Sequence, residues 1–302
     1  TDEKGNPLPG SAGKALRPTL CLLACEAVEG DYRKALPAAA AIELIHNFSL
    51  IHDDVQDDDR ERRHRPTVWA IWGKPQAINA GTAMRVVASL TLLRLEDRSV
   101  PVRKLLRAQR LLDESCLRLI EGQFLDISYE SRLDVGVAEY LSMIEGKTAS
   151  LMACSLEVGA LLGSEDERLV RALRQYGFYL GLAFQIRDDL LGIWGSADRT
   201  GKPVGSDIWK RKKSLPVVFA LERAYGPSRA VLTGFYRGGA KEQASVDRVL
   251  TVLEETGARD EAQRMADRYG EMALPEISRV GLSSWAFGCL QEMANFLTER
   301  DF

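Results

Sequence analysis

Residues 41–60 read AIELIHNFSLIHDDVQDDDR, and this stretch decides the fold class. An ideal helix turns by about 100° per residue, which places His46, Asp53 and Asp57 within about 40° of one another. Asp54 lies on the flank of this face. The opposite face is apolar and holds Leu44, Phe48, Ile51 and Val55. The stretch therefore predicts a helix that packs one stripe and presents acidic groups on the other side.

The same helical spacing continues along nearly all of the chain, without a convincing run of alternating β-branched residues. No linker rich in Pro, Gly or Ser and no internal repeat divides the 302 residues. We therefore predict a single all-α domain over residues 1–302. The expected helices cover 18–28, 35 through the Asp cluster, 76–95, 102–127, 137–162, 165–193 and 214–225, with two or three more after Glu242.

Composition excludes several classes of protein. With 45% hydrophobic and 27% charged residues, the chain is neither disordered nor a disulfide scaffold. The 40 basic and 43 acidic residues give a net charge of -3, without the basic surplus that nucleic-acid binding needs. No apolar run is long enough to span a bilayer. Five cysteines without a Cys-x-x-Cys pair favour a reducing, cytoplasmic location.

The acidic end of the first stretch has two interpretations. Most charge runs are solvated surface. Carboxylates stacked one helical turn apart repel each other, however, and they suit Mg²⁺, which takes one or two carboxylates plus phosphate oxygens. Arg62 and Arg63 follow directly, and guanidinium groups match phosphate geometry. We therefore favour a metal site beside a diphosphate site.

A second acidic segment repeats the theme at Gln185, Asp188 and Asp189, which share a broad helix face with Gly192. A pair of aspartates alone usually belongs to the surface. Apolar flanks favour a position facing a cavity instead, where carboxylates need cations or hydrogen bonds.

Basic residues recur near segments that contain glycine. They are Lys14 with Arg17, Lys147 with Thr148, Lys202, and Lys210 to Lys213. Each group alone is typical of a solvated surface. Gly146-Lys147-Thr148 is not a P-loop, since Leu141 stands where that motif needs its first glycine.

Taken in order, these motifs resemble the trans-isoprenyl diphosphate synthases, or polyprenyl synthetases, which include farnesyl and geranylgeranyl diphosphate synthases. The similar segments are Gly13-Lys14-Ala15-Leu16-Arg17-Pro18, His46, Asp53-Asp54-Val55-Gln56-Asp57, Arg62 to Thr67, Gly122-Gln123 with Asp126, Lys147-Thr148, Phe184 to Asp189, and Gly201 to Pro216.

The resemblance implies an isoprenoid synthase fold with helices around a central cavity, usually as a homodimer. It implies Mg²⁺, with Mn²⁺ as the alternative ion, held by Asp53, Asp54, Asp57, Asp188 and Asp189. Arg62, Lys147 and Lys202 would join the first three of these aspartates in catalysis. The allylic diphosphate, which is dimethylallyl, geranyl or farnesyl diphosphate, would contact Arg62, Lys147, Thr148, Gln185, Lys202 and Lys212. Isopentenyl diphosphate would contact Lys14, Arg17, His46 and Arg63.

The implied activity is head-to-tail condensation of isopentenyl diphosphate with an allylic diphosphate. Phe48, five residues before Asp53, implies a C15 to C20 product by analogy with the family. Gly192 stands where the family usually has a third aspartate, and the family's first helix would be incomplete here. Two rival functions stay open: a class I terpene cyclase, and a non-catalytic prenyl-diphosphate-binding subunit of a heteromeric synthase.

Overall fold

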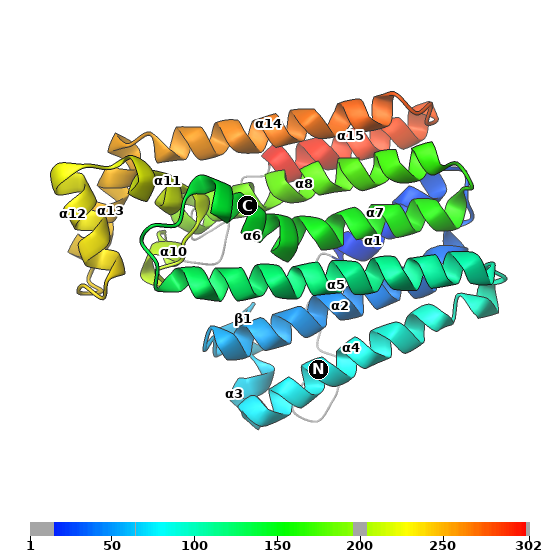
Figure 1. The fold of residues 1–302 in the computed structure, drawn as a ribbon, viewed down its shortest axis with the longest axis horizontal. Helices are drawn as coiled ribbons and strands as arrows, with labels where there is room; N and C mark the ends of the chain where they lie inside the picture. The colour runs from blue at the N-terminus through cyan, green and yellow to red at the C-terminus, as the bar shows by residue number, and fades with distance from the viewer. Residues whose placement is uncertain (1–14, 64, 196–203, 300–302) are drawn as a thin grey trace.

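A computed structural model of the chain describes residues 15–63, 65–195 and 204–299. Long helices run side by side along the molecule, and short helices gather at one end (Figure 1). The helices are α1 (Leu16–Ala27), α2 (Leu36–Gln56), α3 (Val68–Trp72), α4 (Lys74–Leu93), α5 (Val102–Glu130), α6 (Val137–Ile144), α7 (Ser150–Gly163), α8 (Glu167–Trp194), α10 (Ser206–Trp209), α11 (Leu215–Arg223), α12 (Gly226–Tyr236), α13 (Gln243–Glu255), α14 (Ala258–Ser278) and α15 (Ser284–Glu299). The predicted all-α class is confirmed.

The centre of the bundle is built from α7 and α8, which pack on each other. α1 lies along α7, α14 lies along α8, and α4 covers α2. α7 is buried along most of its length, which explains why its sequence is apolar on every side. The largest core joins buried residues of these helices with α5 and α15.

Local signals explain several helix starts. Proline stands in the first turn of α2, α4, α11 and α12, where its missing amide hydrogen costs nothing. Gly226 and Pro227, which follow the helix expected over 214–225, begin α12, a helix that was not expected. The sequence did not reveal that helix because a glycine and a proline mark a helix start as readily as its end.

The predicted helix over 137–162 is interrupted. A single π-helical turn, Glu145–Ala149, separates α6 from α7. Such turns widen a helix locally and are frequent at functional sites. Two short 3₁₀ segments (Tyr32–Ala35 and Glu96–Arg98) and a two-stranded antiparallel hairpin of β1 (Glu61–Arg62) and β2 (Arg65–Pro66) complete the elements. Among the described residues, no helix is long and apolar enough to span a membrane.

Candidate active site

Two cavities meet inside the bundle. The larger has a volume of about 1410 Å³ and is lined by residues of α1, α2, α5, α8 and α15. The smaller, of about 550 Å³, lies toward α6, α10 and the end of α2. Five residues line both cavities: Arg62, Arg63, Lys147, Gln185 and Asp188. Sequence segments far apart in the chain thus converge on the junction, as the motifs predict.

The end of α2 carries the first acidic group, of which Asp53 lines the larger cavity. His46 and Asp53 both line the larger cavity, as the helical spacing predicts. Asp57 follows one turn later, and its amide donates to the Asp53 carbonyl at 2.8 Å. Burial raises the pKa of Asp53 to about 6, although nearby Lys147 opposes the shift. Burial also raises the pKa of Asp57, so both carboxylates lie where added positive charge would be stabilising.

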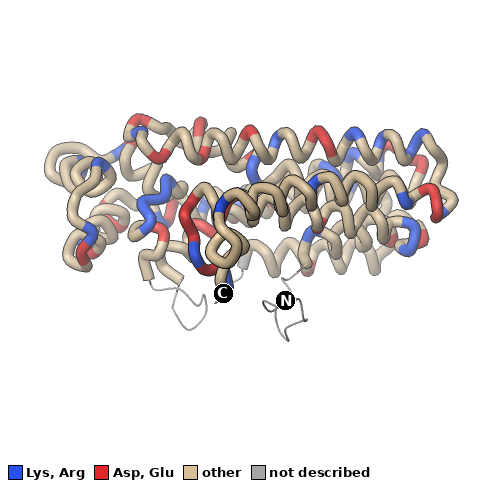
Figure 2. The backbone as a smooth tube through the Cα atoms, turned by 90° about the horizontal axis from the view of Figure 1, so that it is seen from below, with Lys and Arg blue, Asp and Glu red and all other residues tan. Residues whose placement is uncertain are grey.

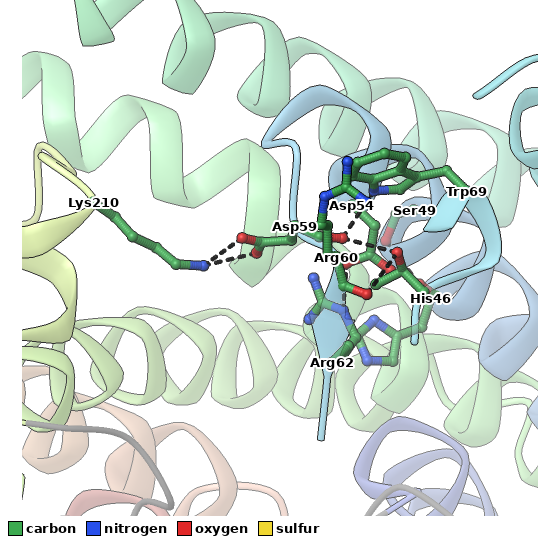
Figure 3. Close-up of polar contacts among 9 residues, drawn as sticks. His46, Ser49, Asp54, Asp59, Arg60, Arg62, Trp69 and Lys210 are labelled. Carbon is green, nitrogen blue, oxygen red and sulfur yellow. Dashed lines mark hydrogen bonds and ion pairs between the residues drawn. The ribbon is translucent and has the colours of Figure 1, made fainter. Parts of the chain in front are cut away.

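Asp54 has a different environment. It is buried, and Arg62 Nε donates to its Oδ1 at 2.7 Å (Figure 3). The hairpin β1–β2 makes this contact by folding back under α2. The segment between α2 and β1 is held in place, since Thr67 Oγ1 and Trp69 Nε1 each donate to the Asp59 carbonyl at 2.8 Å. Asp54 therefore orients Arg62 toward the cavity junction.

On the wall of the larger cavity, Arg17 Nη1 lies 3.3 Å from His46 Nε2. Burial lowers the pKa of His46 to about 3, and Arg17, Arg63 and Arg62 add to the effect, so its imidazole is neutral. Burial lowers the pKa of Arg17 to about 10, well above neutrality, and its Nε has no hydrogen-bond partner. A buried guanidinium with an unused donor is suited to an anionic ligand.

The π-helical turn places Lys147 at the junction. A Cβ on Gly122 of α5 would lie 2.2 Å from the Lys147 amide nitrogen, so glycine permits the two backbones to approach. Lys147 Nζ bonds to the Asp126 carboxylate one turn along α5. Thr148 Oγ1 donates to Gln185 Oε1 at 2.7 Å, which links this turn to α8. Lys147 and Thr148 of the π-helical turn and Gln185 of α8 thus all line the larger cavity.

The second acidic group is divided between two environments. Asp188 lines both cavities. Asp189 is buried and accepts hydrogen bonds from the Leu215 amide at 2.7 Å, Gln185 Nε2 at 3.1 Å and the Tyr140 hydroxyl. Burial raises the pKa of Asp189 to about 7. The Asp189 carboxylate thus links α8 by hydrogen bonds to Tyr140 of α6 and to Leu215 at the start of α11.

The remaining basic residues surround the smaller cavity. Lys212 lines it. Burial alone would lower the pKa of Lys212, but the nearby carboxylates of Asp207, Asp126 and Asp57 outweigh burial and raise it. Lys210 Nζ donates to Asp59 Oδ1 at 2.6 Å and so joins α10 to the end of α2 (Figure 3). Lys14 and Lys202, both predicted substrate ligands, lie outside the described residues.

Comparison with known proteins settles the family. The family model of polyprenyl synthetases matches residues 5–253. A (2E,6E)-farnesyl diphosphate synthase of Mycobacterium tuberculosis is 42% identical over 99% of this chain and 83% of its own. The chain belongs to the polyprenyl synthetase family.

Solved structures of polyprenyl synthetases agree with this fold. That of Streptomyces coelicolor A3(2) has a TM-score of 0.88 and 40% identity, covering 97% of this chain and 87% of the other. A second solved structure is a geranylgeranyl pyrophosphate synthase of Corynebacterium glutamicum, complexed with isoprenyl diphosphate and magnesium. It has a TM-score of 0.87 and 29% identity, covering 96% of this chain and 87% of the other. The isoprenoid synthase fold and the trans-prenyltransferase class, both predicted from the motifs, are confirmed. The terpene cyclase and the non-catalytic subunit are not favoured.

The polyprenyl synthetase motifs explain most of the lining, but the sequence alone missed Tyr140 and the partner of Lys210. Tyr140 supplies the hydroxyl that holds Asp189, yet in the sequence it is one apolar position of an ordinary helix. Lys210 pairs with Asp59 across 151 residues, and no local pattern marks that contact. Asp126, by contrast, belongs to a segment that the family resemblance includes, and it contacts Lys147.

Proposed function

We propose that this polyprenyl synthetase condenses isopentenyl diphosphate with an allylic diphosphate, head to tail, to give a C15 to C20 prenyl diphosphate. The observation that carries the proposal is the junction of the two cavities. Cationic groups gather there, and Arg17 adds a further cationic position on the wall of the larger cavity. Two diphosphate positions facing one apolar space are what the condensation of two prenyl diphosphates requires.

The allylic diphosphate would bind at the junction. Arg62, Lys147 and Lys212 supply positive charge, while Thr148 and Gln185 supply hydrogen bonds. Negative charge grows on the diphosphate as its bond to the allylic carbon breaks, so preorganised cations stabilise the transition state. Lys14 and Lys202 stay predicted ligands on the basis of the family motifs.

The donor set fits a hard divalent cation. Asp53 and Asp57 lie one turn apart with raised pKa values, and Asp188 lines the larger cavity together with Asp53. Mg²⁺ prefers carboxylates together with phosphate oxygens of the substrate. When bound, the ion would neutralise charge on the leaving diphosphate. We propose Mg²⁺, with Mn²⁺ as the alternative, held by Asp53, Asp57 and Asp188. Asp54 and Asp189, also predicted as metal ligands, would act indirectly. Asp54 accepts a hydrogen bond from Arg62, and Asp189 accepts one from Gln185.

Isopentenyl diphosphate would bind in the larger cavity, against Arg17, His46 and Arg63. Neutral His46 can accept a hydrogen bond from Arg17 without repelling it. Because Arg63 lines both cavities, this position would bring the double bond of isopentenyl diphosphate near the allylic carbon. Its π electrons form the new carbon–carbon bond as the allylic carbon loses diphosphate, and a proton then leaves to the released diphosphate.

Apolar side chains also line the larger cavity. Leu50 of α2, Leu119 of α5, Phe184 of α8 and Phe296 of α15 line the larger cavity. They would exclude water, which would otherwise quench the allylic cation.

A loss-of-function variant tests the assignment of the metal and the leaving group. Asp53→Ala should lower turnover at least about 100-fold, since one preorganised electrostatic group commonly supplies that much. A rate within a few fold of wild type would refute the assignment. Asp247→Ala, which removes an exposed carboxylate of α13 that bonds Gln243, is the matched control and should leave the rate unchanged.

We also propose that the enzyme is a homodimer, with a second copy covering α4 and α5. Both helices leave large apolar side chains exposed, among them Leu90 at 59% and Phe124 at 69%. Figure 2 shows α4 on the near side with few charged positions. Apolar faces of this kind mark association surfaces. The predicted cytoplasmic location is retained as part of this proposal.

Sedimentation tests the dimer. Leu90→Glu should convert a particle of two 33.5 kDa chains into a monomer. Tyr225→Glu, at an exposed aromatic residue away from α4 and α5, should leave the dimer intact. A monomeric wild-type protein would contradict the proposal.

A further inference from the structure

Gln123 of α5 carries a buried amide whose two ends are used differently. The side chain is 6% exposed and lines the larger cavity. Its nitrogen Nε2 donates to Gln56 Oε1 of α2 at 2.9 Å. Its oxygen Oε1 is buried and has no hydrogen-bond partner among the described residues. A buried oxygen without a donor costs stability, so its presence calls for an explanation.

The other glutamine of this cavity has both ends of its amide occupied. Gln185 Oε1 accepts from Thr148 Oγ1 at 2.7 Å, and Gln185 Nε2 donates to Asp189 Oδ1 at 3.1 Å. In Gln123, by contrast, the bond to Gln56 takes the donor end of the amide. The acceptor end of Gln123 is therefore the end that remains for a ligand.

The position of Gln123 along α5 determines which part of a ligand it would meet. Asp126, Gln123 and Leu119 follow one another at steps of three and four residues, so they share one face of the helix at intervals of about 5 Å. Asp126 lines the smaller cavity, where it contacts Lys147, whereas Gln123 and Leu119 line the larger one. This face thus passes from the proposed diphosphate position, through one amide, to an apolar side chain.

This part of α5 also lies close to the π-helical turn. The residue before Gln123 is Gly122, on which a Cβ would lie 2.2 Å from the Lys147 amide nitrogen. The turn carries Lys147 and Thr148, which would bind the allylic diphosphate. The first carbons of an allylic chain are attached directly to that diphosphate, so they would lie beside Gln123.

We propose that Gln123 Oε1 stabilises the positive charge that develops on the allylic carbons as the diphosphate leaves. The inference rests on the proposed function, because that reaction produces the charge. The oxygen is the negative end of the amide dipole, and a dipole already aimed at developing charge is most effective where water is excluded. Gln56 is then a positioning residue, since its bond holds the amide in the orientation that leaves the oxygen available.

Two unreactive analogues test the proposal without turnover. 2,3-Dihydrogeranyl diphosphate is uncharged at carbon 3, and its 3-aza counterpart carries a protonated amine there. Calorimetry with Mg²⁺ present gives the ratio of their affinities, and the wild type should prefer the amine. Gln123→Met has a similar shape but no amide oxygen, so it should lower that preference about tenfold. Its affinity for the uncharged analogue should not change.

The chain offers a matched control on the same helix. Gln109 of α5 also has a buried Oε1 without a partner among the described residues, but its Nε2 bonds to Asp113 and it lines neither cavity. Gln109→Met should therefore keep the wild-type preference. Gln123→Glu, which retains an acceptor oxygen, should keep it too. Gln56→Met removes only the anchor of the amide and should lower the preference by a smaller factor than Gln123→Met.

Steady-state kinetics adds a second readout. Gln123→Met should lower kcat and leave KM for the allylic diphosphate unchanged, because Gln123 would meet the carbons and not the diphosphate. A general disturbance of the site would instead change both constants.

A folded Gln123→Met protein that prefers the amine as strongly as the wild type would overturn the inference, and so would an equal loss in Gln109→Met. If Gln123→Met does not fold, an unchanged preference in Gln56→Met overturns it instead. In each case a wild type that elongates prenyl diphosphates leaves the proposed function intact. A wild type that elongates no prenyl diphosphate would refute the proposed function itself.

Discussion

The Arg62 guanidinium reaches back to the side of α2, where its Nε donates to Asp54 Oδ1 at 2.7 Å. Two residues of neighbouring motifs thus form one unit, with the acidic member buried and the basic member about one third exposed. The pair separates the functions of adjacent aspartates, since Asp53 faces the cavity while Asp54 faces Arg62.

This separation predicts different kinetic effects at the two aspartates. Asp54→Asn should raise KM for the allylic diphosphate about tenfold, because it loses one charged hydrogen bond that orients Arg62. Asp53→Asn should lower kcat instead. Steady-state kinetics with each substrate varied in turn distinguishes the two. Equal effects of both variants on kcat would show that the aspartates share one function.

The close approach of Gly122 to Lys147 predicts strong sensitivity to a single methyl group. Gly122→Ala would push its Cβ into the backbone of the π-helical turn, at a cost of about 1–3 kcal/mol in the free energy of unfolding. It should also lower kcat by displacing Lys147. Gly234→Ala in α12 meets nothing within 4 Å and serves as control. Denaturant unfolding and turnover measure the two effects, and equal stability of both variants would contradict the packing argument.

The raised pKa of Asp53 predicts a pH-dependent stability in the absence of metal. Burial raises this pKa from 3.8 to about 6, so the folded protein holds the proton more tightly than the unfolded chain. The stabilisation from that proton is present below about pH 4 and is lost as the pH rises to about 6. At pH 7.5 in EDTA the wild type should be less stable than Asp53→Asn, by up to about 3 kcal/mol.

Melting curves at pH 4.5 and pH 7.5 measure this difference. The contribution of His46, whose pKa is lowered to about 3, is common to both proteins and cancels. Parallel dependence of the two proteins on pH would show that Asp53 is not the responsible group.

Product length should depend on Ser49 more than on Phe48. Ser49 lines the larger cavity, whereas Phe48 is 5% exposed and packs edge-on against His52, with ring centroids 5.5 Å apart. Ser49→Phe should therefore shorten the product by filling the cavity. Phe48→Ala should lengthen it only if the space that it opens in the core joins the cavity. Chromatography of dephosphorylated products measures both effects. An unchanged product from Ser49→Phe would show that position 49 does not limit the length of the product.

The sequence predicts the parts of this site that depend on helical periodicity. His46 and Asp53 line the larger cavity because they are seven residues apart on one helix. Asp188 and Gly192 both line the smaller cavity because they are four residues apart on another. The apolar stripe was less well predicted, since Leu44, Ile51 and Val55 are only half-buried. Periodicity identifies which residues share a face, but the neighbours that cover the face come from the tertiary fold.

Contacts between distant segments could not be predicted in this way. The bond between Tyr140 and Asp189 joins residues 49 apart, and the approach of Asp207 to Gly192 depends on how α10 returns to α8. The glycine was visible as a departure from the family motif. Only the three-dimensional arrangement shows that a carboxylate from another helix occupies its space.

The most direct test of the proposed condensation is a product assay with three primers. The purified protein is incubated with Mg²⁺, isopentenyl diphosphate and, separately, dimethylallyl, geranyl or farnesyl diphosphate. We predict linear prenyl diphosphates of 15 to 20 carbons, each extended from its primer by five-carbon units. Cyclised hydrocarbons, or no elongation of any primer, would contradict the account.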